Sequence, residues 1–119
     1  MRAEVSQRRP IGWWAAAQKS FRKFPIEAQE QCATALAIIA DGGKPAIAKP
    51  LLGLGSGVME IALAYRGDAF RVVYALQLGQ EIWVVHAFQK KSTQGFKTSQ
   101  RDIELIRARI RWIKEQQTS

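Results

Sequence analysis

Three β-rich runs joined by two-residue glycine turns constrain the fold of this chain more than any other feature. The runs span residues 58–66, 69–78 and 81–89, and the turns between them are Gly67-Asp68 and Gly79-Gln80. Two-residue loops that contain glycine join antiparallel neighbours in β-hairpins. The pattern therefore predicts a three-stranded antiparallel meander. Because the second and third runs are apolar at successive positions, it also predicts cover on both faces of the sheet.

Helical patterns flank this predicted sheet. A short helical segment is expected at 20–24, and a longer helix is expected from Pro25 to about residue 40, because proline is accepted in the first turn of a helix. The apolar positions of the longer helix repeat with a 3.6-residue period, at Ala28, Cys32, Ala35, Leu36 and Ile39. Asp41-Gly42-Gly43 ends it, since glycine accepts the left-handed conformation of helix termini.

The C-terminal part of the chain predicts one more helix, from Ser99 to about Gln117. Thr98 or Ser99 is expected to cap it, with Asp102 in the first turn. Its apolar stripe consists of Ile103, Ile106, Ile110 and Ile113.

Residues 44–57 are expected to be a loop because prolines and glycines interrupt them. Residues 1–19 are a lead-in, for which a first strand is one interpretation. The order helix, helix, three strands, helix predicts one α+β domain over residues 1–119, with the meander packed against two N-terminal helices and one C-terminal helix.

The charge balance favours a polyanionic partner. Lys and Arg number 18 against 10 Asp and Glu, a formal net charge of +8, which suits nucleic acid, an acidic protein or an anionic membrane surface. Cys32 has no second cysteine to pair with, which is typical of a reducing compartment, and one His with one Cys cannot form the usual zinc sets. No stretch approaches the ~20 apolar residues of a membrane-spanning helix. The apolar run at 11–17 contains Gly12 and two tryptophans and is a poor signal-peptide core, so we expect a cytoplasmic protein.

Candidate chemistry in the sequence is cationic. The Gly-rich run at 53–57 lacks the Gly-Lys-Ser/Thr ending of a phosphate loop and leads into a strand, so it is interpreted as a turn. The candidate residues on or beside the strands and at the start of the last helix are Arg66, Arg71, Tyr74, His86, Lys90, Lys91, Lys97 and Arg101. Strict alternation places Arg71 and Tyr74 on opposite faces unless a bulge intervenes. The competing interpretations are a solvated rim for the cations and a satisfied, half-buried histidine for His86.

Three segments carry a resemblance to a known family. They are Gly55-Ser56-Gly57-Val58-Met59-Glu60-Ile61, Gly67-Asp68-Ala69-Phe70-Arg71-Val72-Val73-Tyr74 and Val85-His86-Ala87-Phe88-Gln89-Lys90-Lys91-Ser92. They resemble the phage-derived Gp49-like family of the HigB/RelE/ParE superfamily of type II toxin–antitoxin toxins. The resemblance spans roughly residues 20–113.

The resemblance implies a small sheet flanked by helices and a toxin that cleaves mRNA in the ribosomal decoding site without a metal or other cofactor. It implies a cognate helix-turn-helix antitoxin as partner, besides the ribosome and its mRNA, and no membrane. By this resemblance Arg71 contacts phosphate, and Lys90 and Lys91 lie beside the scissile phosphate. Where many superfamily members have Glu-Leu-Arg or Glu-Ile-Arg, this chain has Glu60-Ile61-Ala62 and lacks the arginine.

The expected reaction needs little acid–base machinery. In RNA the 2′-hydroxyl is the nucleophile, so alignment, charge stabilisation and proton transfer suffice. Arg71, Lys90 and Lys91 are the predicted charge stabilisers, with His86 as the predicted proton-transfer group. Arg66, Tyr74, Lys97 and Arg101 are the predicted RNA contacts. Two alternatives stay open: a non-nuclease, gyrase-poisoning member of the fold, and a degenerate module that binds an antitoxin and regulates its operon.

Overall fold

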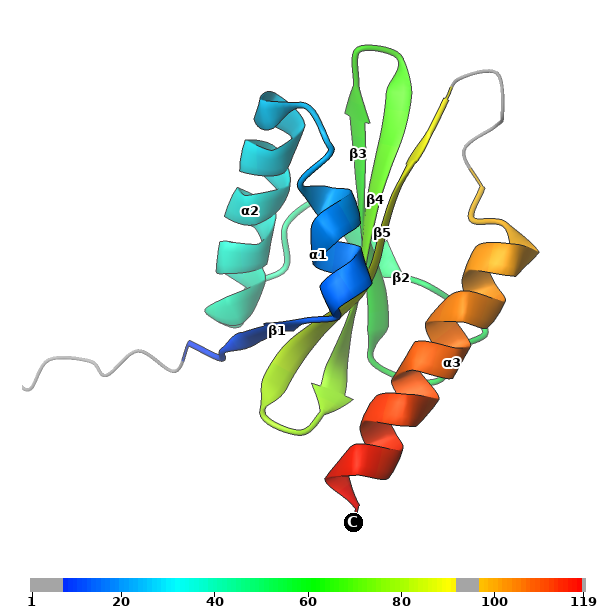
Figure 1. Cartoon of the computed structure of the whole chain (residues 1–119). Coiled ribbons are helices and arrows are strands. Elements are labelled where there is room, and N and C mark those ends of the chain that lie inside the picture. Colours follow the sequence, from blue (N-terminus) through cyan, green and yellow to red (C-terminus); the bar gives the residue numbers. More distant parts are fainter. Residues whose placement is uncertain (1–7, 92–96, 119) are drawn as a thin grey trace, which may run out of the picture.

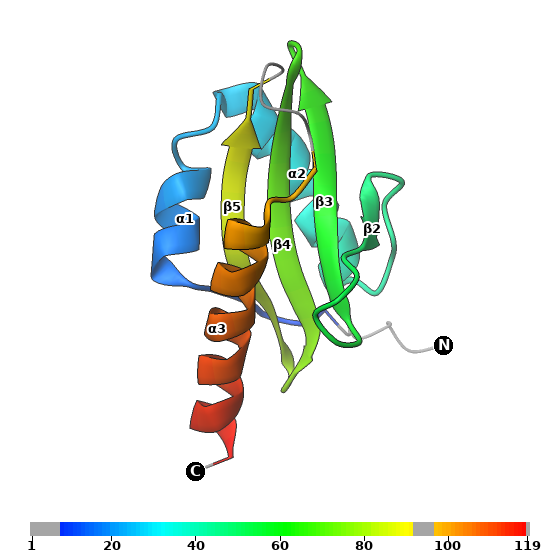
Figure 2. The ribbon, with the colours of Figure 1, turned by 90° about the vertical axis from the view of Figure 1, so that its right-hand side faces the viewer.

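The structure of the protein is a computed structural model that describes residues 8–91 and 97–118. Its elements, in chain order, are β1 (Ile11–Trp13), α1 (Ala15–Phe21), α2 (Ile26–Ala40), β2 (Ala48–Pro50), β3 (Val58–Tyr65), β4 (Asp68–Leu78), β5 (Glu81–Lys90) and α3 (Gln100–Gln117). The strands form one five-stranded sheet in the order β1-β5-β4-β3-β2. Helices α1 and α2 cover one face of the sheet and α3 covers the other (Figures 1 and 2). The predicted α+β class is confirmed.

The predicted meander is confirmed as β3, β4 and β5, which pair antiparallel. The first turn is centred one residue earlier than predicted, at Arg66-Gly67, and Asp68 already belongs to β4. Arg66 has φ 52° and Gly67 has φ 84°, the positive values that a two-residue type I′ hairpin needs at both positions.

Two short strands at the edges of the sheet extend the meander. β1 lies in the lead-in and pairs parallel with β5, and β2 pairs antiparallel with β3. The prediction of a loop over residues 44–57 is therefore wrong at Ala48–Pro50. A three-residue strand ending in proline has little sequence signal of its own, and an edge strand is where a sheet accepts proline.

The first helix begins earlier than predicted. It spans Ala15–Phe21 rather than 20–24, because three consecutive alanines favour helix strongly. Lys23 and Phe24 instead form a tight turn, in which their amides donate to the carbonyls of Ser20 and Phe21. Pro25 follows and α2 starts at Ile26.

Each face of the sheet carries its own apolar cluster. The five predicted apolar positions of α2 are all buried against Ile61, Phe70, Val72 and Tyr74 of the sheet. On the other face Ile106, Ile110 and Ile113 of α3 pack on Val73 and Val85. Ile103 is half-buried and lies at the edge of a pocket. Ser99 caps α3 by accepting from the Asp102 amide at 3.1 Å, as predicted.

A β-bulge in β5 places two consecutive residues, Val85 and His86, on the α3 face of the sheet. Val73 pairs with His86 while Tyr74 pairs with Val84, so Val85 is the extra residue. Val85 packs in the α3 cluster and His86 bonds to Asp102 of α3, which puts two consecutive side chains on the same face. Among the described residues, no helix is long and apolar enough to cross a bilayer.

Candidate functional site

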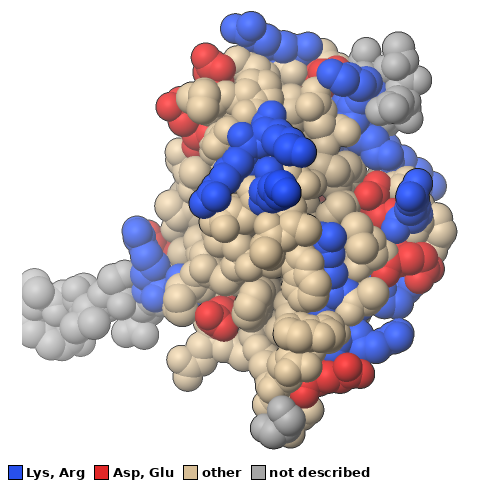
Figure 3. Space-filling view, viewed as in Figure 1, with Lys and Arg blue, Asp and Glu red and all other residues tan. Residues whose placement is uncertain are grey.

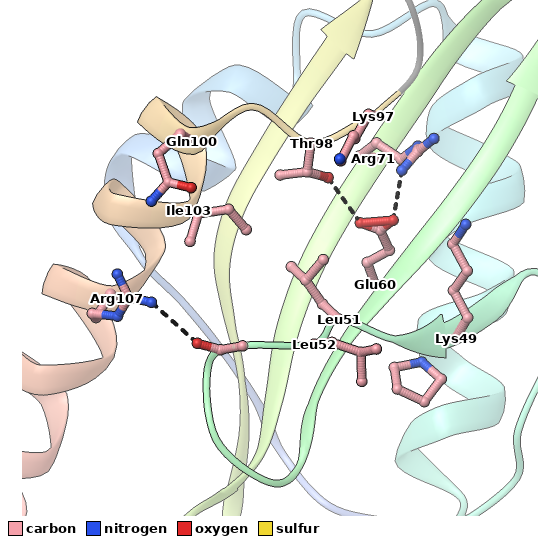
Figure 4. A pocket seen from close by; sticks show the side chains of 12 residues that line it. Lys49, Leu51, Leu52, Glu60, Arg71, Lys97, Thr98, Gln100, Ile103 and Arg107 are labelled. Carbon is pink, nitrogen blue, oxygen red and sulfur yellow. Dashed lines mark hydrogen bonds and ion pairs between the residues drawn. The ribbon is translucent and has the colours of Figure 1, made fainter.

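A hollow lies between the start of α3, strand β2 with the loop after it, and the centre of β3 and β4. It encloses about 640 Å³. Four cations line it, at Lys49, Arg71, Lys97 and Arg107. Among the described lining residues Glu60 is the one carboxylate, and Leu51, Leu52 and Ile103 give the wall an apolar part (Figure 4). We call this hollow the cationic pocket. Its charge and its shape suit a phosphate attached to a less polar group.

A buried ion pair forms the floor of the cationic pocket. Arg71 donates to Glu60 Oε1 at 2.5 Å, and the Thr98 hydroxyl donates to Glu60 Oε2 at 3.2 Å (Figure 4). The Glu60 side chain is 2% exposed and the Arg71 side chain 10%. The three residues come from β3, β4 and the residue pair before α3, so the floor joins three separate parts of the chain.

Strand register explains why Glu60 and Arg71 meet. Glu60 pairs with Val73, and Arg71 pairs with Ala62. All four side chains lie on the α3 face of the sheet, because positions two apart on a strand share a face. Glu60 and Arg71 are thus diagonal cross-strand neighbours, a distance that long side chains span.

The remaining cations surround this floor from other elements. Lys49 comes from β2 and Lys97 from the segment before α3, and both are exposed. Arg107 of α3 donates to the Gly53 carbonyl at 3.1 Å and pairs with Glu104 at 3.0 Å. Four cations against one carboxylate leave the cationic pocket with a positive formal charge.

A smaller hollow adjoins the cationic pocket on the other side of Arg71. It encloses about 280 Å³ at the end of the β3–β4 hairpin, and its lining includes Arg71, Ala62, Ala64, Ala69 and Asp68. Ala62, which the resemblance marks as a position expected to hold an arginine, has only a methyl group and leaves the hollow open. Arg71 therefore lies at the boundary of two hollows.

His86 belongs to a different cluster, beneath α3. Its Nε2 lies 2.8 Å from Asp102 Oδ1, and its Nδ1 lies 3.3 Å from a guanidinium nitrogen of Arg109, which also donates to the Val85 carbonyl at 2.8 Å. Because a guanidinium only donates, Nδ1 accepts and the ring proton sits on Nε2, which donates to Asp102. Burial lowers the pKa of His86, Asp102 opposes this and Arg109 adds to it, so the imidazole is neutral at pH 7. This is the satisfied histidine of the competing interpretation, and it anchors α3 on β5.

The other predicted cations lie around these groups without lining the cationic pocket. The Nζ of Lys90 is 3.9 Å from Asp102 Oδ2, and that of Lys91 is 3.7 Å from Asp68 Oδ2. Arg66 is exposed in the β3–β4 turn with its guanidinium 5.3 Å from the centre of the Tyr65 ring, and Arg101 is exposed in the first turn of α3. Figure 3 shows basic side chains at the top of the molecule and along α3.

Tyr74 lies apart from every other predicted site residue. It is 1% exposed in the core beneath α1 and α2, on the face of the sheet opposite to Arg71. Burial raises the pKa of Tyr74 to about 12. The extra residue of β4 lies between Ala75 and Leu78, beyond Tyr74, so strict alternation separates Arg71 from Tyr74, and Tyr74 offers no surface to RNA.

Of the eight predicted site residues, the structure brings Arg71 and Lys97 into the cationic pocket. Lys49, Glu60, Thr98 and Arg107 also line the pocket and were not among the predicted site residues. Glu60 lies in the segment Glu60-Ile61-Ala62, which is part of the family resemblance. A signal was available for Glu60, because strand alternation places it on the same face of the sheet as Ala62, where the resemblance leads one to expect an arginine. Within residues 8–91 and 97–118, no three His, Cys, Asp or Glu side chains lie close enough together to hold a metal ion.

Comparison with protein-family models gives a match over most of the chain. The family model described as phage derived protein Gp49-like (DUF891) matches residues 19–111, which include every residue that lines the cationic pocket. No curated protein and no solved structure matches the chain.

Proposed function

The chain belongs to the Gp49-like family of phage-derived proteins, and from this premise we propose that it is the toxin of a type II toxin–antitoxin system that cleaves mRNA on the ribosome. The observation that carries the proposal is the cationic pocket, where a buried Glu60–Arg71 pair lies among Lys49, Lys97 and Arg107. An arrangement of this kind binds a phosphodiester and also holds a carboxylate next to it.

The proposed reaction is an attack by the RNA on itself. The 2′-oxygen bonds to the adjacent phosphorus, the bond from phosphorus to the 5′-oxygen breaks, and a 2′,3′-cyclic phosphate and a 5′-hydroxyl result. Glu60 takes the proton of the 2′-hydroxyl, and the leaving 5′-oxygen takes a proton from an ammonium of the pocket rim. The cations stabilise the charge that builds on the phosphate oxygens.

Arg71 has two roles in this proposal. In the free protein its ion pair fixes the orientation of the Glu60 carboxylate. When RNA enters, its guanidinium turns toward the phosphate, because a bidentate contact to phosphate is as favourable for guanidinium as one to carboxylate. Opening a buried pair is unfavourable, so we propose that the ribosome supplies mRNA already held in the reactive geometry.

The antitoxin is the second proposed partner. A cognate helix-turn-helix protein would cover the cationic pocket and compete with RNA for it. The net charge of +8 predicts that the segment covering it is acidic.

The experiment that tests the proposed function adds purified protein to translating ribosomes and maps the mRNA by primer extension. The expected result is cleavage within codons in the decoding site, with no cleavage of the same mRNA free in solution. The Lys23→Gln variant serves as a control, because Lys23 is exposed between α1 and α2 on the opposite face. Intact mRNA at excess protein, or inhibition of gyrase in a supercoiling assay instead, contradicts the proposal.

A specific observation also favours a second function, an antitoxin-binding module that regulates its own operon without cleaving RNA. The charged groups of Arg71 and Glu60 bond to each other, and His86 bonds to Asp102 and Arg109. Such pairs also serve as structural interactions in a protein that has lost its activity. If expression of the protein leaves growth and mRNA unchanged while its complex with the antitoxin binds operator DNA, this second function holds.

A further inference from the structure

Two smaller hollows continue from the cationic pocket along α3. Arg107 lines the cationic pocket and also a hollow of about 220 Å³ that it shares with Leu54, Arg111 and Lys114. Leu54, Ile110 and Lys114 in turn line a third hollow of about 80 Å³. The hollows share lining residues and follow each other between α3 and the loop at 51–57, and we treat them as one groove (Figures 1 and 2). We call it the α3 groove.

Helical spacing places the cations of the α3 groove in a row. Arg107, Arg111 and Lys114 stand at i, i+4 and i+7, on one side of α3. At ~1.5 Å per residue they cover about 10 Å of helix axis. Arg109 lies on another side of α3, where it contacts His86 and lies 5.5 Å from the centre of the Trp14 ring. Arg109 of α3 therefore makes structural contacts, whereas Arg107, Arg111 and Lys114 line the groove.

The groove is fixed in place and its cations are accessible. Arg107 bonds to the Gly53 carbonyl at 3.1 Å, and Ser56 bonds to Gln77 at 2.9 Å, so the loop is held to both α3 and β4. Arg111 and Lys114 are exposed, and in the part of the chain that the structure describes no ion pair joins either of them to a carboxylate. Within the described ranges, Glu104 is the one carboxylate that forms an ion pair with a cation of this row, and its partner is Arg107.

We propose that the α3 groove is a track for single-stranded RNA, which binds the phosphates of the two or three nucleotides next to the linkage held in the cationic pocket. The proposal rests on the proposed function and adds the form of its substrate. About 10 Å corresponds to about three nucleotides at the ~3.4 Å rise of a duplex strand and to fewer in an extended strand. A single file of cations in a narrow groove suits an extended backbone with a charge at every residue. An acidic helix would instead need a wide apolar groove with anchors at i, i+3 and i+7.

The test measures binding of a fluorescent ten-nucleotide 2′-O-methyl RNA, which cannot be cleaved, by anisotropy at several salt concentrations. The double variant Arg111→Gln/Lys114→Gln removes two cations of the groove. The matched control, Lys19→Gln/Lys23→Gln, removes two exposed cations at the end of α1 and in the turn after it, on the opposite face of the sheet. Glutamine keeps a long polar side chain at exposed positions, so both variants are expected to fold, and circular dichroism checks this.

Counterion release sets the expected magnitude. Each lost phosphate contact on a single strand reduces the slope of log K against log salt by about 0.7, so the groove variant should have a slope about 1.4 shallower than the wild type. At 0.1 M salt this corresponds to about 25-fold weaker binding, while the control stays within about twofold. Equal losses in both variants, or no loss in the groove variant, overturn the proposal.

Two further outcomes separate the possible explanations. If the groove variant loses affinity for a poly-glutamate peptide but not for RNA, the groove binds an acidic protein and the proposal is wrong. If RNA binding changes as expected but ribosomes with wild-type protein leave mRNA intact, the track is supported and the proposed function fails. If the wild type cleaves mRNA on ribosomes but the groove variant binds RNA as the wild type does, the proposed function is supported and the RNA track is wrong.

Discussion

Replacing both members of the Glu60–Arg71 pair with methionine separates their contribution to stability from their role in the cationic pocket. Arg71→Met leaves a carboxylate that is 2% exposed without its guanidinium, and Glu60→Met leaves a guanidinium whose side chain is 10% exposed without its carboxylate. Removing one partner of a buried pair lowers the free energy of unfolding by about 3–5 kcal/mol. At about 4 °C per kcal/mol, each single variant should unfold at least about 12 °C below the wild type.

The double variant should recover most of this stability. Methionine has a volume close to that of both side chains, and replacing a whole buried pair by apolar residues is neutral or stabilising. We therefore expect the double variant to lie within about 1 kcal/mol of the wild type, a coupling of several kcal/mol between the two sites. Urea unfolding followed by the fluorescence of the four tryptophans measures all four proteins. Single-variant losses that add within about 0.5 kcal/mol would refute the coupling.

The same double variant tests the chemistry in a protein that is still folded. It lacks both the proposed proton acceptor and the guanidinium, so cleavage should fall at least about 100-fold, since general acid–base catalysis contributes about 10²–10⁴. Primer extension on ribosome-bound mRNA gives the rate. Cleavage at the wild-type rate would show that the pair has only a structural role.

Three further predictions follow from the geometry. Ala62→Arg adds a cation to the hollow beside Arg71 and should strengthen RNA binding about fivefold at 0.1 M salt; anisotropy measures it, and weaker binding contradicts it. Lys97→Gln removes a rim cation and should slow cleavage about tenfold without changing the urea midpoint; an unchanged rate removes Lys97 from the site. Because burial keeps the pKa of His86 below its ordinary value of 6.5, the unfolded chain binds the proton more tightly, so stability is lost as pH falls below about 6.5. The wild type should therefore lose more stability between pH 8 and pH 5 than His86→Gln does, as urea titrations at each pH will show, and parallel curves would contradict this.

The parts of the fold that sequence predicts are those with strong local signals. The meander is predictable because its turns require glycine, and α3 because Ser99 caps it and its isoleucines repeat with the helical period. Strand β2 is not predictable from the sequence, because its three residues, which end in Pro50, form a strand only through pairing with β3. The start of α1 was also not predictable. The three alanines at 15–17 favour a helix and the residues before Pro25 form a turn, and the spacing of apolar residues does not show where the helix gives way to the turn.

The site was predictable only in part, because its residues meet through register and packing. Arg71 could be singled out from the resemblance, but Glu60 is 11 positions away and reaches it only through the pairing of β3 with β4. Lys49 and Arg107 line the same pocket from opposite sides, because Lys49 belongs to β2 and Arg107 to α3. Val85 lies on the α3 face beside His86 because of the bulge, an irregularity that alternation cannot anticipate.

The most direct test of the central claim compares wild type and the Glu60→Met/Arg71→Met variant, at equal concentration and matched stability, on ribosomes stalled with a defined codon in the decoding site. We predict that the wild type cuts the mRNA in that codon and that the variant leaves it intact. Uncut mRNA with the wild type, or equal cutting by both proteins, would contradict the claim that this cationic pocket cleaves RNA.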